Sequence, residues 1–393
     1  MNIYLDNAAT TAVTPEVLEA MLPFLRENYG NASSKHYEIG RTARRAVMNA
    51  RQQVARMLGA EIPADEDKVS GVFFTSCATE SNNWVIQNAP LANGGKKHII
   101  TSAVEHPAVL TTCAFMEKHY GYKVTVVPVD NTGLVDPAAV EKAMTPDTAL
   151  VSVMVANNEV GTLQPVAEIA KIAKKGGALM HTDAVQAAGK IPLDVNALGV
   201  DFLSISGHKF HGPKGVGALY VRKGVNLPPL LHGGGQENNH RAGTYNAAGI
   251  VGMGKAAELA CAEMETVGKR QFALVEELWR GLSAASPKIY RNGHPEKRIP
   301  NILNVRYDGA EGEAILMRLD MFGIQVSSGS ACATGDIKAS HVLLALGIPQ
   351  ENAHGSIRFS LGRETTEDDI RKVIEIVPKQ VQMIRDMSVT WKG

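Results

Sequence analysis

Short apolar runs of the kind that form buried strands alternate with longer helical patterns through the first two-thirds of the chain. Val72–Thr75 is such a run, and helix-like sequence starts near Thr79. The other strand-like runs are residues 98–101, 124–127, 150–155, 178–182 and 202–206, and helical candidates such as 138–144 and 166–175 lie between several of them. This alternation predicts an α/β fold with a mostly parallel sheet.

The pattern changes around Gly249. A long helical stretch covers about 251–284, interrupted only mildly by Gly268, and is followed by strand-like 302–305, helix-like 311–321, strand-like 356–361 and a helical tail from Thr366. A chain of 393 residues exceeds the size at which one hydrophobic core stops growing. We therefore expect a large α/β domain over residues 15–250 and a smaller α+β domain formed by 1–14 and 251–393.

Charge and hydropathy argue against two classes of partner. The 40 basic residues equal the 40 acidic ones, so no global charge favours nucleic acid or an anionic membrane. Five arginines between positions 41 and 56 follow a helical pattern, which we interpret as a solvated helix face. No apolar run approaches the ~20 residues of a membrane span. We expect neither a membrane partner nor direct contact with nucleic acid.

Two features predict a cytoplasmic protein. Residues 1–6 show neither the basic nor the apolar segment of a signal peptide, and they are not rich in arginine and serine as a transit peptide would be. The four cysteines, Cys77, Cys113, Cys261 and Cys332, include no C-x-x-C pair and suit neither a zinc site nor a disulfide framework. We expect reduced thiols in a cytosolic enzyme, any one of which could be reactive.

Polar residues follow several predicted strands, at the sheet edge where open α/β sheets bind ligands. They are Ala78, Thr79, His106, Asn158, Asp183 and residues 206–209. The chain has no P-loop, and its glycines at 233–235 lack the strand–turn–helix context of a nucleotide fingerprint. His208 and His211 have no carboxylate or cysteine nearby at metal-ligand spacing, so we expect no metal site.

The remaining set fits pyridoxal-phosphate chemistry, which needs a lysine for an imine, an acid to keep the pyridine nitrogen protonated, and a phosphate cradle. Lys209 could supply the lysine and Asp183 the acid. Residues 75–81 join a strand to a helix, so free backbone N–H groups and the helix dipole would face an anion. Taken singly, Lys209 could be a surface residue, and Asp183 or Thr79 could be a helix cap. Their order and their placement at strand ends favour one shared site.

Seven blocks of sequence carry a resemblance to a known family. They are 4–11 (YLDNAATT), 75–82 (TSCATESN), 105–109 (EHPAV), 157–161 (NNEVG), 181–186 (HTDAVQ), 208–215 (HKFHGPKG) and 328–332 (SGSAC). In this order they resemble the NifS/IscS-type cysteine desulfurases, of the class-V aminotransferase family, over nearly the whole chain. The resemblance implies the aspartate-aminotransferase-like architecture of PLP fold type I, with a mostly parallel seven-stranded sheet in the large domain, and a homodimer.

The resemblance also implies a role for each matched residue around the cofactor, pyridoxal 5'-phosphate. Lys209 resembles the Schiff-base lysine and the base that moves the Cα proton. Asp183 resembles the partner of the pyridine nitrogen, and Gln186 the donor to the phenolic oxygen. His106 resembles the residue stacked on the ring, although a core histidine is the plainer explanation when it is taken alone.

Further matches concern the phosphate and the substrate. The positions that match the phosphate side are Ala78, Thr79, Ser206 and His208, with Thr244 resembling a ligand donated by the other subunit. Residues 236–242 depart from the family, which usually carries more arginine there and a serine at 242. Asn158 resembles a residue near the phenolic oxygen and the substrate. Arg358 resembles the clamp on the substrate carboxylate, which an arginine fork can bind bidentately.

Cys332 lies in a stretch of small residues, 327–336, which would make a poor core but a mobile loop able to carry a nucleophile. By the resemblance, its thiolate attacks the sulfur of bound cysteine. We expect this loop to be mobile, with the sulfur beyond contact distance of the cofactor in the resting enzyme. Cys113 and Cys261 lie in helical patterns and are expected to be inert small hydrophobes. Cys77 replaces a common glycine, and we expect no catalytic role for it.

The resemblance implies conversion of L-cysteine to L-alanine, with the sulfur held on Cys332 as a persulfide for an iron–sulfur scaffold or another acceptor protein. General iron–sulfur assembly, nitrogenase maturation and tRNA thiolation stay open as destinations. The group that deprotonates Cys332 also stays open, with His106 the first candidate. A selenocysteine lyase or an aminotransferase of the same architecture is the alternative enzyme, and a catalytically inactive relative acting as a binding partner is the alternative class.

Overall fold

The computed structural model describes residues 2–63, 71–328, 339–387 and 391, and its largest element is a seven-stranded sheet within these residues. In spatial order the strands are β2 (Val72–Thr75), β8 (Gly217–Val221), β7 (Phe202–Ser206), β6 (Leu179–Asp183), β5 (Thr148–Ser152), β3 (His98–Ser102) and β4 (Lys123–Val127). Only β8 runs against the others in this sheet of the described chain. The predicted mostly parallel sheet is confirmed, although the apolar pattern had not indicated β8.

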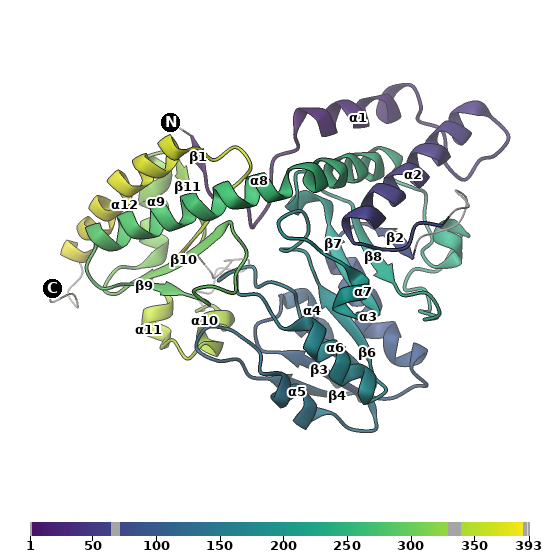
Figure 1. Cartoon of the computed structure of the whole chain (residues 1–393), viewed down its shortest axis with the longest axis horizontal. Helices are drawn as coiled ribbons and strands as arrows, with labels where there is room; N and C mark the ends of the chain where they lie inside the picture. Colours follow the sequence, from purple (N-terminus) through teal and green to yellow (C-terminus); the bar gives the residue numbers. More distant parts are fainter. Residues whose placement is uncertain (1, 64–70, 329–338, 388–390, 392–393) are drawn as a thin grey trace.

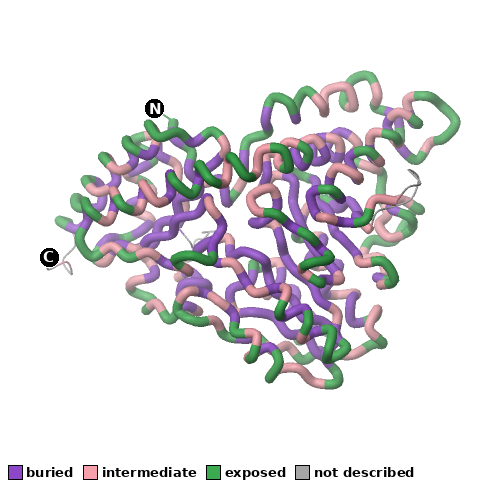
Figure 2. Tube along the Cα trace, in the orientation of Figure 1, coloured by how far each residue is buried: buried purple, intermediate pink, exposed green. Residues whose placement is uncertain are grey.

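Helices cover both faces of this sheet (Figure 1). The helices of residues 15–198 are, in chain order, α1 (Pro15–Arg26), α2 (Glu38–Met57), α3 (Ala78–Ala92), α4 (Pro107–Tyr120), α5 (Pro137–Ala143), α6 (Val166–Lys175) and α7 (Val195–Leu198). Of these, α1 packs against the later helix at 247–285 and not directly on the sheet. Neighbouring strand residues point to opposite faces. Phe74 and Leu203 therefore belong to a core with α2 and α6, whereas Phe73 and Phe202 belong to a core with α3 and α4. Figure 2 shows the buried strands between these more exposed helices.

The C-terminal third forms a second core. β9 (Ile289–Asn292), β10 (Ile302–Tyr307) and β12 (Ser356–Ser360) pair antiparallel, and β1 (Ile3–Tyr4) pairs in parallel with β11 (Ile324–Gln325). Their core includes α9 (Gly312–Met321) and α12 (Glu367–Met387), as well as Ile3 and Leu5 from the N-terminus. Two short helices, α10 (His341–Ala345) and α11 (Gln350–Ala353), lie beside it. The first residues of the chain thus pack with its last third.

One long helix, α8 (Ala247–Ala285), connects the two cores. Its first half contacts α1 and α2 and its second half contacts α12, β9 and β10, as Figure 1 shows. It corresponds to the helix predicted at 251–284, which Gly268 does not interrupt. Because α8 runs through residue 250 without a break, the domain boundary placed there stays a prediction. No helix in the described ranges is both long and apolar enough to span a membrane.

The predicted solvated face of α2 is wrong at one arginine. Arg41 and Arg45 are exposed, but only 2% of the Arg51 side chain is exposed, and its guanidinium contacts both oxygens of Glu237 at 2.5 and 2.7 Å. Position 51 lies four residues from Val47, on the buried face of the helix. The charge was therefore misread as a surface feature because its partner is distant in the sequence.

Candidate active site

Most of the predicted site residues line one cavity of about 790 Å³ at the carboxyl ends of the parallel strands. These residues are Ala78, Thr79, His106, Asn158, Asp183, Gln186, Ser206, His208, Lys209 and Arg358. They come from the start of α3, from the last residues of β6 and β7, from the segments that follow β3, β5, β6 and β7, and from β12. Parallel strands bring their carboxyl ends to the same edge, so residues from distant parts of the chain meet there.

Lys209 ends a short 3-10 turn, η1 (Gly207–Lys209), directly after β7. Its ammonium donates to the carbonyl oxygens of Ala8 at 2.5 Å and Ala9 at 2.8 Å. Burial, followed by the charge of Arg358, lowers the pKa of Lys209 to about 8, against the attraction of nearby carboxylates. Lysine with a pKa near neutrality exists partly as the free amine, which can form an imine and can accept a proton.

Asp183 ends β6 and lies buried in the cavity wall. Its two carboxylate oxygens accept hydrogen bonds from Asn82 Nδ2 at 2.7 Å and from the backbone N–H of Val185 at 3.0 Å. These donors hold the carboxylate in one orientation. Gln186, one turn further along, donates from Nε2 to the Ala8 carbonyl at 2.9 Å.

The start of α3 lies at one end of the cavity and is suited to an anion. Cys77 caps this helix without a side-chain hydrogen bond, so the backbone N–H groups at Ala78 and Thr79 keep their capacity to donate. The Ser206 hydroxyl is buried and has no hydrogen-bond partner among the described residues. His208 lies beside it, and burial, followed by the charge of Lys209, lowers the pKa of His208 to about 4. Helix dipole, N–H groups and free hydroxyl together suit a phosphate.

His106 caps the start of α4 through its own ring. Nδ1 accepts a hydrogen bond from the backbone N–H of Ala108 at 3.0 Å, so the neutral ring carries its proton on Nε2. Burial lowers the pKa of His106, with a contribution in the opposite direction from Asp183. At neutral pH the ring is therefore an uncharged hydrogen-bond donor. A role as the base for Cys332 stays a prediction.

Arg358 lies in β12 with only 8% of its side chain exposed. Nη2 binds Asp6 Oδ1 at 2.7 Å, and Nη1 donates to the carbonyl of Asn158 at 2.9 Å. Its Nε–H is buried without a hydrogen-bond partner in the described chain. The backbone of Arg358 pairs with Ser327 in both directions. A fixed guanidinium with an unused donor at the cavity wall suits a carboxylate ligand.

Cys332 lies outside the described residues, and so do the expectations about the mobility of its loop and the position of its sulfur. Ser327 and Ser328, which precede that loop, line the cavity, as do Ala339 and Ser340, which follow it. The described chain therefore reaches the cavity on both sides of the segment that carries Cys332.

Several residues of the cavity were not singled out from the sequence. Asp6, Ala8 and Ala9 contact Arg358, Gln186 or Lys209, and the two alanines do so only through backbone carbonyls. A contact made by a backbone carbonyl cannot be predicted from the type of the residue. Asp6, Ala8 and Ala9 could have been identified only because they lie inside the matched block 4–11.

Two buried acids were also missed. Glu105 accepts hydrogen bonds from the Ser102 hydroxyl at 2.6 Å and from the Met154 N–H at 3.0 Å, and burial raises its pKa to about 8. Glu159 accepts from the hydroxyl of Ser340, and burial raises its pKa to about 7. Both acids lie within matched blocks and directly beside predicted site residues, which was the available signal.

The remaining predicted residues lie elsewhere. Thr244 is exposed and lines a separate hollow of about 170 Å³, so a contribution to a second subunit's site stays a prediction. Cys113 is buried, which raises its pKa to about 12, as suits an inert thiol. Cys261 is exposed on α8. The expectation that it is an inert small hydrophobe stays a prediction. No group of three potential metal ligands occurs within the described ranges.

Comparison with known proteins agrees with this geometry. Residues 3–373 match the aminotransferase class-V family. The cysteine desulfurase IscS of Methanosarcina thermophila is 51% identical over 98% of this chain and 93% of its own length. A solved NifS-like protein is 41% identical with a TM-score of 0.89, covering 98% of this chain and all of its own. SspA, solved in complex with cysteine, is 35% identical with a TM-score of 0.79, over 93% of this chain and all of its own. The fold is that of the NifS-like PLP enzymes of fold type I, and the chain belongs to the class-V aminotransferase family and, within it, to the cysteine desulfurases of the NifS/IscS type.

Proposed function

We propose that this chain is a pyridoxal-phosphate-dependent cysteine desulfurase, which converts L-cysteine to L-alanine and receives the sulfur on Cys332 as a persulfide. The observation that carries the proposal is a single cavity that combines Lys209, Asp183, an anion-binding helix start and the guanidinium of Arg358. Relatives at about 50% identity named cysteine desulfurase support it, as does the cysteine complex of SspA.

The residues of the cavity fit pyridoxal phosphate. The unpartnered hydroxyl of Ser206 and the N–H groups at Ala78 and Thr79 would hold its phosphate. Asp183 would bind the pyridine nitrogen, and Lys209 would hold the cofactor covalently. When bound, the cofactor supplies an electron-withdrawing ring that acidifies the Cα–H of the attached amino acid.

Each residue then has one task in the reaction. The fork of Arg358 binds the carboxylate of cysteine and fixes the orientation of its Cα. Asp183 keeps the pyridine nitrogen protonated, and the neutral amine of Lys209 moves the proton at Cα. The thiolate of Cys332 attacks the substrate sulfur: an S–S bond forms, the C–S bond breaks, and its electron pair stays on the carbon fragment, which takes up a proton to become alanine.

Partner contacts and location belong to the same proposal. We infer a homodimer in which Thr244, exposed in the single chain, contributes to the second subunit's phosphate site. The persulfide would pass to an iron–sulfur scaffold or another sulfur acceptor. A cytoplasmic location is supported by the free thiols of Cys77, Cys113 and Cys261, since reducing compartments maintain that state.

The proposal is tested by supplying the purified chain with pyridoxal phosphate, L-cysteine and a thiol reductant that releases the sulfur. We expect alanine and sulfide in equal amounts. A selenocysteine lyase would instead turn over selenocysteine well and cysteine poorly, and its activity would survive loss of Cys332. A chain that binds pyridoxal phosphate but releases no alanine from either amino acid would support the inactive-partner alternative.

A further inference from the structure

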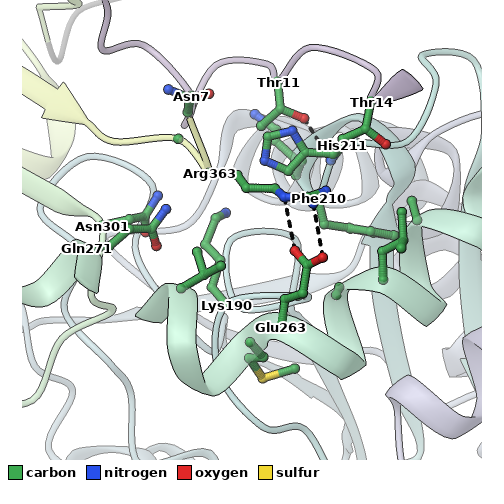
Figure 3. A pocket seen from close by; sticks show the side chains of 18 of the residues that line it. Asn7, Thr11, Thr14, Lys190, Phe210, His211, Glu263, Gln271, Asn301 and Arg363 are labelled. Carbon is green, nitrogen blue, oxygen red and sulfur yellow. Dashed lines mark hydrogen bonds and ion pairs between the residues drawn. The ribbon is translucent and has the colours of Figure 1, made fainter. Parts of the chain in front are cut away.

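A second cavity, of about 50 Å³, adjoins the active site. Among the described residues that line the two cavities, only Lys209 lines both. Figure 3 shows Lys190 in this smaller cavity, between Asn301 on one side and the paired Glu263 and Arg363 on the other. Lys190 follows the 181–186 block but has no role in the proposed reaction.

Lys190 does not serve as an ion-pair partner within the described part of the chain. The carboxylate that lines this cavity, Glu263, is bound by Arg363 through two contacts of 3.0 Å. Burial, followed by the charges of Lys209 and Arg358, lowers the pKa of Lys190 to about 7. Holding an amine there costs free energy. Its other contacts must therefore account for its position.

Both of those contacts are made to one residue, Gln186. The Lys190 amine donates to the backbone carbonyl of Gln186 at 3.0 Å and to its side-chain Oε1 at 3.2 Å. A neutral amine still has two N–H groups for these two acceptors, so the arrangement is available on either side of the pKa. At the other end of the amide, Nε2 donates to the carbonyl of Ala8 at 2.9 Å.

These two neighbours determine which way the Gln186 amide faces. The ammonium of Lys190 can only donate, so the amide oxygen must face it. The carbonyl of Ala8 can only accept, so the amide nitrogen must face that side, and this carbonyl also accepts from Lys209 at 2.5 Å. The second N–H of Nε2 is left for the active-site cavity, which Gln186 lines.

We propose that Lys190 is a positioning residue of the reaction: from the smaller cavity it holds the Gln186 amide so that an N–H is presented to the phenolic oxygen of the bound cofactor. This inference rests on the proposed function. An N–H on that oxygen withdraws its negative charge. The nitrogen of Lys209 that joins the cofactor then holds its own proton less tightly.

The test is the pH titration of the visible absorption of the bound cofactor, recorded without substrate, for wild type, Lys190→Met, Gln186→Ala and the double variant. We expect the midpoint to rise by about one pH unit in Lys190→Met, a tenfold change in the protonation equilibrium. The shift should be as large in Gln186→Ala and no larger in the double variant. Lys190→Arg, which keeps the donors, should restore most of the wild-type value.

Arg363→Met is the matched control, because it removes another cation that lines the smaller cavity and has no hydrogen bond to Gln186 among the described residues. It should leave the midpoint unchanged. If Lys190→Met still shifts the midpoint in the Gln186→Ala background, the effect is through-space charge and the inference is overturned. An unchanged midpoint in a coloured Lys190→Met enzyme overturns the inference alone. A wild type that forms no coloured complex overturns the proposed function as well.

Discussion

Arg358 and Asp6 form an ion pair of 2.7 Å on the wall of the candidate active site, although 352 positions separate them in the sequence. The pair joins the N-terminal segment to β12, and the carbonyl of Asn158 accepts from the same guanidinium. The guanidinium is therefore held in one orientation, and its Nε–H is buried without a hydrogen-bond partner within the described chain. Such pre-organisation reduces the entropy lost on binding a carboxylate.

Arg358→Lys should weaken substrate binding while leaving the cofactor in place. A lysine provides one point charge instead of a planar fork, and it loses at least one charged hydrogen bond, worth about 1.5–3 kcal/mol. We expect KM for L-cysteine to rise ~10–100-fold, measured by alanine formation. Arg363→Lys, at an ion-paired arginine outside this cavity, is the control. An unchanged KM in Arg358→Lys would remove Arg358 from the carboxylate site.

Lys209→Ala should abolish the visible absorption of the bound cofactor and the formation of alanine. The amine that forms the covalent link and moves the Cα proton is then absent. Lys214→Ala is the control, since Lys214 lies in the same matched block but does not line the cavity. The absorption band is read from the spectrum after gel filtration with pyridoxal phosphate. A Lys209→Ala enzyme that keeps the wild-type band would mean that another amine anchors the cofactor.

Cys332→Ala should keep the cofactor band and its change on adding L-cysteine, yet form essentially no alanine or sulfide. Loss of the nucleophile stops the reaction after substrate has bound. Cys261→Ala, which removes an exposed thiol on α8, is the control and should remain active. Alanine production at the wild-type rate in Cys332→Ala would place the nucleophile elsewhere, with Cys77 in the cavity wall as the first candidate.

The fold was predictable wherever a strand or helix is buried on one regular face. Runs such as Val72–Thr75 and Phe202–Ser206 are uniformly apolar or small because helices cover both sides of them. β8 (Gly217–Val221) was missed because it follows the glycines and proline of 212–215, which look like loop sequence. β1 has only two residues, which are too few to show the alternation of apolar and polar residues that indicates a strand.

The candidate site was predictable at strand ends, and much less so at contacts made by backbone atoms. Lys209 and Asp183 carry chemistry in their side chains, so residue type and position together identified them. The carbonyls of Ala8 and Ala9 that bind Lys209 have no such mark. Arg51 was misjudged for a related reason, because its partner Glu237 lies in the 3-10 turn η2 (Gln236–Asn239), far along the chain.

Arg51→Met should destabilise the protein strongly, because it leaves the buried carboxylate of Glu237 without its partner. Breaking a buried ion pair on one side costs about 3–5 kcal/mol. Arg45→Met, on the exposed face of the same helix, is the matched control and should leave the unfolding free energy nearly unchanged. Both are measured by denaturant unfolding followed by circular dichroism. Equal effects for the two variants would contradict the structural distinction between the two faces of α2.

Glu105→Gln should make stability less dependent on pH. Glu105 is fully buried beside His106, and one of its oxygens, Oε2, has no hydrogen-bond partner among the described residues. Burial raises its pKa from 4.5 to about 8. Between these two values the folded chain holds a proton that the unfolded chain has lost, so the unfolding free energy falls as pH rises through this window. Glutamine cannot ionise and removes that dependence.

The measurement is denaturant unfolding of Glu105→Gln and wild type, both loaded with cofactor, at pH values from 6 to 9. The stability of Glu105→Gln relative to wild type should increase between pH 6 and 8 by on the order of 1–3 kcal/mol, and then level off. Only this change with pH is diagnostic, because the substitution can alter stability by a constant amount through lost hydrogen bonding. Glu265→Gln, at an exposed glutamate on α8 that is already ionised throughout this range, should show no such change. A constant difference between Glu105→Gln and wild type from pH 6 to 9 would mean that Glu105 keeps the same charge in the folded chain across that range.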